Sequence, residues 1–173
     1  MRKPCEMNLL EEIESAFSDR QMPQSAVRND APATDEYLEA KCFSGKHWKD
    51  FSCADLDRLS GAIFGFSPEA FCFYLPGILA ASIRENNPDT MMSQSIINML
   101  DRIAAPSSWD DFFGARWPLL SPAECAAIQN WILWLTEFEP PIFGDGPLSR
   151  AYDTLDLIAL QKRATPIARA GWG

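Results

Sequence analysis

The chain has 173 residues, with 24 acidic and 15 basic side chains and a formal net charge of −9. This length suggests one domain with a sizeable core, and the hydrophobic fraction of 47% argues against wholesale disorder. An acidic surface repels phosphate backbones, which disfavours nucleic-acid binding, and it attracts basic proteins. Many proteins are acidic only for solubility, so the charge alone does not distinguish a partner-binding surface from one that only keeps the protein soluble.

The N-terminal sequence lacks the pattern of a signal peptide, because acids follow its basic start where an apolar segment would be. The longest apolar run covers residues 70–83 and contains Pro76. A membrane span needs about 20 apolar residues. We therefore expect a soluble, cytoplasmic protein without a membrane partner.

Helix-start signals recur from the N-terminus onward. Asn8 and Glu11 have capping-box spacing and precede an apolar face, and residues 18–34 have the composition of a loop. Thr34 is a second cap, of a helix that Gly45 ends. Ser52 is a third, followed by one helix with Leu56, Leu59 and Ile63 on its apolar stripe.

The segment from Ser67 to Ile83 begins with a Ser N-cap and Pro at the first helical position, and it is apolar on both sides. Pro76 inside a helix costs about 3 kcal/mol, whereas each large buried apolar side chain returns about 1.5–3 kcal/mol. We therefore predict a buried central helix, kinked at Pro76 and either bent or briefly broken over residues 74–77.

Thr90 or Ser93 starts the next helix, which includes Ile103 and ends at Pro106. One short helix follows before Pro118, and Ser121 begins another with a capping box. The last helix runs from Leu148 to Arg163. We predict an all-α, single-domain bundle of six or seven helices over residues 1–164, with a mobile C-terminal tail over 165–173.

Residues that could carry catalysis or bind a metal are few. The five cysteines include no C-x-x-C pair, which argues against disulfides and structural zinc and favours reduced, mostly buried thiols. The single histidine, His47, excludes multi-histidine metal sites and is interpreted as a surface or turn residue. Most of the six tryptophans are expected in the core. We therefore predict no enzyme activity, no cofactor and no metal.

Four separate segments together resemble a family of small, uncharacterised bacterial domains. They are IESAFSDRQMP, FSGKHWKDF, FSPEAFCFYLPGILAASI and LLSPAECAAIQNWILWL, which match A-F-x-x-R-x-x-P, G-x-x-W, S-P-E-A-F-x-[FY]-[YF]-L-P and S-P-x-E/Q. The likeness covers residues 8–138, and its specific part is the S-P-E-A-F-C-F-Y-L-P segment. Residues from 139 onward depart from the pattern.

This resemblance implies an immunity protein, because members look like small acidic proteins found beside secreted toxins. The partner would be a cognate basic toxin delivered by a type VI secretion system, and charge favours a nuclease. The alternative is a non-enzymatic adaptor or self-associating scaffold protein, and either could be a monomer or a homodimer. Acidic side chains would attract the toxin. The predicted partner-binding residues are Asp30, Asp35, Glu36, Glu39, Asp110, Asp111, Glu137, Glu139 and Asp145.

Overall fold

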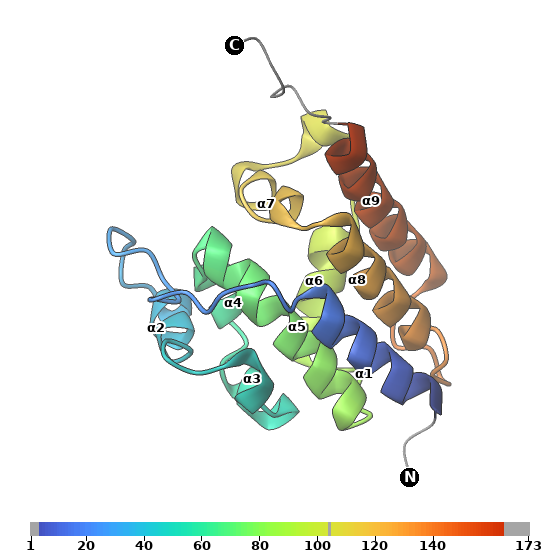
Figure 1. Cartoon of the computed structure of the whole chain (residues 1–173), viewed down its shortest axis with the longest axis horizontal. Coiled ribbons are helices and arrows are strands. Elements are labelled where there is room, and N and C mark those ends of the chain that lie inside the picture. Colours follow the sequence, from blue (N-terminus) through green and yellow to red (C-terminus); the bar gives the residue numbers. More distant parts are fainter. Residues whose placement is uncertain (1–3, 104, 165–173) are drawn as a thin grey trace, which may run out of the picture.

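A computed structural model describes residues 4–103 and 105–164, and the predicted tail over 165–173 lies outside them. The described residues form nine α-helices and three short 3-10 helices, with no strand among them (Figure 1). The chain order is α1 (Pro4–Ala16), α2 (Asp35–Lys41), η1 (Trp48–Asp50), α3 (Cys53–Arg58), α4 (Ala62–Gly65), α5 (Pro68–Arg84), α6 (Met91–Leu100), η2 (Pro106–Ser108), α7 (Asp111–Gly114), η3 (Trp117–Leu119), α8 (Pro122–Leu135) and α9 (Asp145–Ala164).

The predicted all-α fold is confirmed, with more helices than expected. The helix predicted after Ser52 is two short ones, because the chain turns at residues 59–61 between α3 and α4. Five N-caps are confirmed: Thr34, Ser52, Ser67, Thr90 and Ser121 each accept a backbone hydrogen bond from the first turn of the following helix. The capping boxes at Ser52 and Ser121 are both complete.

Three helix boundaries differ from the prediction. The first helix starts at Pro4, so Asn8 lies inside it and does not cap it; Pro is favoured in the first turn, where its missing N–H costs nothing. The helix after Thr90 ends at Leu100, and Ile103 is 74% exposed. Arg102 donates to the carbonyl of Met99 (2.7 Å), which satisfies one of the free carbonyls at this end. The last helix begins at Asp145, three residues before Leu148.

Helix α5 is the centre of the fold, and residues 70–83 are all buried. It is continuous through Pro76, so of the two predicted alternatives, a bend or a brief break over residues 74–77, the break does not occur, and the predicted burial is confirmed. The neighbouring glycine has a packing role. A Cβ atom at Gly77 would lie 2.6 Å from the carbonyl oxygen of Trp48, so only glycine lets η1 approach α5 this closely.

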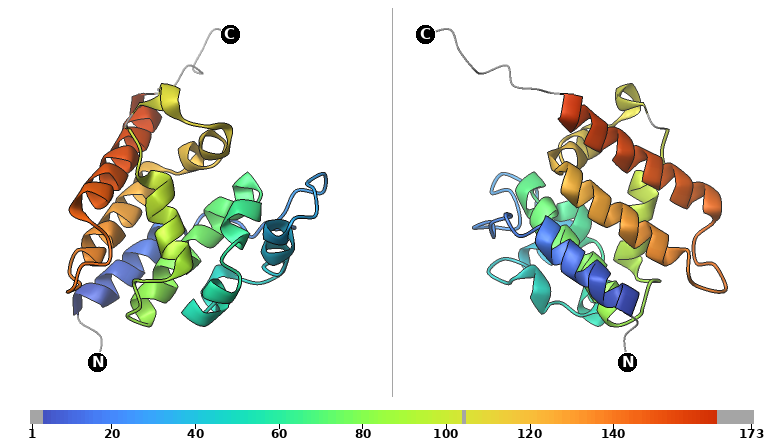
Figure 2. Two further views of the ribbon diagram at one scale, coloured as in Figure 1. Left: turned by 180° about the vertical axis from the view of Figure 1, so that it is seen from behind. Right: turned by 45° about the vertical axis from the view of Figure 1, so that its right-hand side comes forward.

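Six of the other eight described α-helices form two groups beside α5, and α6 packs against both α5 and α9. Helices α1, α8 and α9 lie side by side, with α8 between the other two (Figure 2), and α1 also packs on α5. The shorter helices α2, α3 and α4 lie on the other side of α5 (Figure 1). One hydrophobic core runs through both groups. Among the described residues, none of the helices has both the length and the hydrophobicity that a membrane span requires.

Candidate functional site

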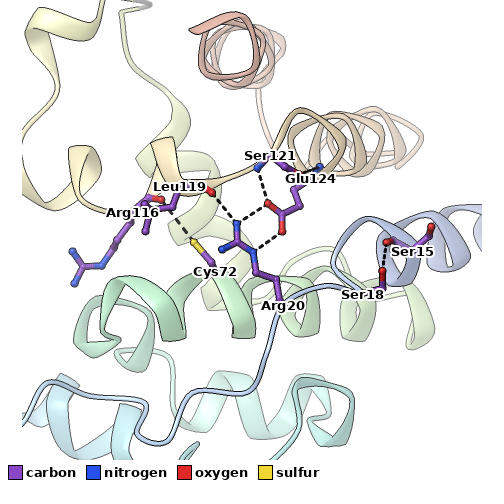
Figure 3. Close-up of polar contacts among 8 residues, drawn as sticks. All are labelled: Ser15, Ser18, Arg20, Cys72, Arg116, Leu119, Ser121 and Glu124. Carbon is purple, nitrogen blue, oxygen red and sulfur yellow. Dashed lines mark hydrogen bonds and ion pairs between the residues drawn. The ribbon is translucent and has the colours of Figure 1, made fainter. Parts of the chain in front are cut away.

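Arg20 and Glu124 form a two-point ion pair between the segment after α1 and the first turn of α8 (Figure 3). Nε of Arg20 lies 2.6 Å from Oε1 of Glu124, and Nη2 lies 2.7 Å from Oε2. Nη2 also donates to the carbonyl of Leu119, and Glu124 accepts from the N–H of Ser121. The hydrogen bond to Glu124 raises the pKa of Arg20. Both charges are therefore satisfied within the fold.

The segments that carry the family resemblance contact one another in the folded protein. Arg20 belongs to the first segment and Glu124 to the last, and their ion pair joins the two. The G-x-x-W segment contributes Trp48, which packs on Gly77 of α5. Tyr74, also on α5, donates to the carbonyl of Phe43 (2.7 Å). These residues stabilise the fold and leave no free reactive group at their junction.

Three cysteines are buried and have unreactive thiol groups. Burial raises the pKa of Cys53 and Cys125 to about 12 and that of Cys72 to about 11. The thiolate is the reactive form, so these thiols stay protonated and unreactive at neutral pH. Cys42 is exposed, and the side chain of Cys5 lies outside the described part of the chain.

The single histidine forms a hydrogen bond that stabilises the local fold. His47 is exposed and lies before η1, as expected for a turn residue, where its Nδ1 accepts a hydrogen bond from the N–H of Lys49 (3.2 Å). Within residues 4–103 and 105–164, no group of three His, Cys, Asp or Glu side chains could hold a metal ion.

Four of the predicted partner-binding acids lie on or just before α2: Asp30, Asp35, Glu36 and Glu39. Asp30 is paired with Arg28 through two hydrogen bonds, which lower the pKa of its carboxyl group. Glu39 accepts from the backbone N–H of Gly61 (2.7 Å) and thereby joins α2 to the turn before α4. Hydrogen bonds with its own backbone and with the side chain of Thr34 lower the pKa of Glu36. Three of these four acids are thus engaged within the protein.

The other five acids lie elsewhere: Asp110 and Asp111 at α7, Glu137 and Glu139 between α8 and α9, and Asp145 at the first position of α9. Asp110 caps α7 by accepting from Phe113 (2.8 Å) and pairs with Arg102 (3.3 Å). Figure 1 places α2 and the α8–α9 connection on opposite sides of the molecule, so the nine acids do not form one patch.

One of these acids, Glu137, borders a groove between α1 and α8, which we call the α1–α8 groove. Its volume is about 370 Å³, and it is lined by Asn8, Leu9, Glu12, Asn130, Leu133, Trp134 and Glu137. Leu9 and Trp134 are buried, whereas Leu133 is 50% exposed. Asn130 donates to Glu12 across the groove (2.7 Å). The groove thus combines apolar side chains with two carboxylates, and its lining contains no Lys or Arg.

The prediction from sequence missed Glu12, Leu133 and Trp134 as site residues. The distribution of charge in the sequence could have pointed to this region. Residues 4–19 contain five acids and residues 117–149 contain four, and neither stretch has a Lys or Arg. The fold places these two stretches side by side as α1 and α8. The prediction that most tryptophans are core residues is confirmed: Trp48, Trp117, Trp131 and Trp134 are buried.

The chain belongs to a family of unknown function (DUF6714), whose model matches residues 6–141. The match covers α8 and all of α1 except its first two residues, includes every residue that lines the α1–α8 groove, and ends before α9. No curated protein and no solved structure matches the chain.

Proposed function

For this member of the DUF6714 family, we propose the function of an immunity protein that binds and neutralises a secreted antibacterial toxin. The toxin is a basic protein, a nuclease effector of a type VI secretion system. Inhibition is stoichiometric and takes place in the cytoplasm of the toxin-producing cell. The chain needs no cofactor and performs no reaction in this role.

The observation that carries the proposal is the charge of the surface over α1, α8 and the segment after α8. In that region five acids lie in residues 4–19 and four in residues 117–149, without any Lys or Arg in either stretch. Lys49, from η1, pairs with one of these acids, Glu14, at 2.8 Å, and Arg20 pairs with another, Glu124, which is buried and adds nothing to the surface charge. The remaining excess of negative charge would attract a basic protein and speed its association.

The choice of a nuclease follows from the same electrostatics. A protein that binds nucleic acid presents Lys and Arg side chains to the phosphates. A surface rich in carboxylates competes for those side chains and thereby blocks access of the nucleic acid. The net charge of −9 disfavours the opposite arrangement, in which this chain itself binds nucleic acid.

A non-catalytic role is supported by how the reactive side chains are used. Cys53, Cys72 and Cys125 are buried thiols with raised pKa values. His47 accepts a backbone hydrogen bond through Nδ1, and the Arg20–Glu124 pair is saturated by its own partners. Each of these groups therefore contributes to the fold, and a binding function requires none of them to react.

Co-expression tests the proposal. The product of the neighbouring reading frame is induced in a sensitive bacterial strain, with or without this chain. We expect growth to be restored by the chain, and a one-to-one complex to form from the purified proteins at micromolar concentration. Absence of both rescue and complex would overturn the proposal. A large homo-oligomer without affinity for the toxin would instead support a scaffold function.

A further inference from the structure

We propose that the α1–α8 groove is the docking site for a basic segment of a protein partner, which inserts a Lys or Arg side chain. The aliphatic stem of that side chain packs against Leu133 and Trp134, and its charged end lies between Glu12 and Glu137. The identification of the natural partner as a toxin rests on the proposed function, whereas the chemistry of the docking site follows from the groove itself.

The apolar part of the groove gives the inserted side chain a surface to cover. Leu9 and Trp134 are almost fully buried, and Leu133 stands half exposed beside them. Covering the exposed part of Leu133 removes apolar area from water, which is favourable. A partner side chain with a hydrocarbon stem therefore gains free energy in this groove before any charge is considered.

The carboxylates of the groove select the charge of the inserted side chain. Glu12 comes from α1 and Glu137 from the turn after α8, and both border the same hollow of about 370 Å³. Asn130 donates to Oε1 of Glu12, which fixes that carboxylate across the groove. With no Lys or Arg in the lining, a cation from outside meets attraction alone, and an acidic side chain meets repulsion.

Lys and Arg side chains combine both required properties. Their methylene stems pack along apolar surface while the charged end reaches a polar partner or water. A purely apolar side chain would cover Leu133 but leave the carboxylates without a counter-charge. A single exposed ion pair is worth little in water, so the partial cover that the groove provides is what gives the interaction its strength.

The test uses a short amphipathic helical peptide made of Leu and Lys, and the same peptide with Glu in place of Lys. Binding to the full chain is measured by calorimetry at low salt. We expect the Lys peptide to bind and the Glu peptide to bind at least about tenfold more weakly. Equal affinity for the two peptides, or no binding of the Lys peptide, would overturn the proposal.

Two groove variants, Leu133→Asn and Glu137→Lys, have matched controls on α9. Leu160→Asn is the control for Leu133→Asn, because Leu160 is 49% exposed and Leu133 is 50% exposed. Asp156→Lys is the control for Glu137→Lys, since both acids are exposed. The groove variants should weaken binding of the Lys peptide by about tenfold or more, and the controls should not. Circular dichroism and thermal melting establish that all four variants are folded, and equal losses in both sets would contradict the docking site.

The same variants, tested with the toxin, separate this proposal from the proposed function. If the toxin binds the wild type and the groove variants equally well, the docking site is wrong and the inhibitor function stands. If the toxin does not bind but the Lys peptide does so in a groove-dependent way, the docking site stands and the inhibitor function is wrong.

Discussion

Arg20 and Glu124 are 104 residues apart in the chain, yet their side chains form two hydrogen bonds of 2.6 and 2.7 Å. The side chain of Glu124 is only 4% exposed. This ion pair fixes the segment after α1 to the start of α8, and α1 and α8 form the walls of the proposed docking groove.

Replacing Arg20 by Ala should lower the free energy of unfolding by about 3 kcal/mol, because it leaves the buried carboxylate of Glu124 without its counter-charge. Urea unfolding followed by circular dichroism measures this change. The control is Arg28→Ala, which breaks an ion pair whose two side chains are both largely exposed. The control should cause a much smaller loss, and losses of equal size would show that the Arg20–Glu124 pair is not a structural clamp.

Gly77→Ala should destabilise the protein by about 1–3 kcal/mol, since the added Cβ meets the carbonyl oxygen of Trp48 at 2.6 Å and forces η1 away from α5. Gly114→Ala is the matched control, because a Cβ there meets nothing within 4 Å. Thermal melting of the two variants compares them directly. A Gly77→Ala protein as stable as the Gly114→Ala protein would contradict the close approach of η1 to α5.

Thiol labelling at pH 8 should separate the cysteines of a Cys5→Ser variant into two classes. Cys42 is exposed and should react quickly. Cys53, Cys72 and Cys125 are buried, with pKa values of about 12, 11 and 12, so they are protonated at this pH and should react only after unfolding. A colorimetric thiol reagent should therefore detect one fast thiol in the folded protein. Two or more fast thiols would contradict this assignment.

Lowering the pH should destabilise the protein, in part because the carboxylate of Asp110 becomes protonated. The hydrogen bond from the N–H of Phe113, together with Arg102, lowers the pKa of this carboxyl group below its ordinary value of 3.8. Because the folded pKa is the lower one, the stabilisation is present above the unfolded pKa and is lost as the pH falls through the folded pKa. The unfolding free energy of the wild type should therefore fall more steeply below about pH 4 than that of Asp110→Asn. Parallel curves for the two proteins would rule out this contribution.

Features that depend on neighbouring residues could be predicted from the sequence. The capping box of Ser121 and Glu124 is an example, because its hydrogen bonds join residues three positions apart. The burial of α5 could also be predicted from the sequence, since that segment is apolar on both sides. The predicted start of the first helix, at Asn8, was wrong. Pro4 and Asn8 are competing start signals, and the capping-box pattern at Asn8 looked more complete.

Features that depend on tertiary contacts could not be predicted in the same way. Arg20 and Glu124 both stood in the segments of the family resemblance, but nothing in either segment identifies the other as its partner. The pair Pro76 and Gly77 suggested a bend or a break, whereas the structure explains Gly77 by the close approach of Trp48 from η1. The α1–α8 groove likewise depends on the packing of two helices that are far apart in the chain.

The most direct test of the central claim is a titration of the toxin's nuclease activity with this chain. The proposed function predicts a linear loss of activity that reaches completion at one equivalent. It also predicts slower association at high salt, because screening weakens the attraction between the acidic surface and a basic partner. Full nuclease activity in the presence of an excess of the chain would contradict the account.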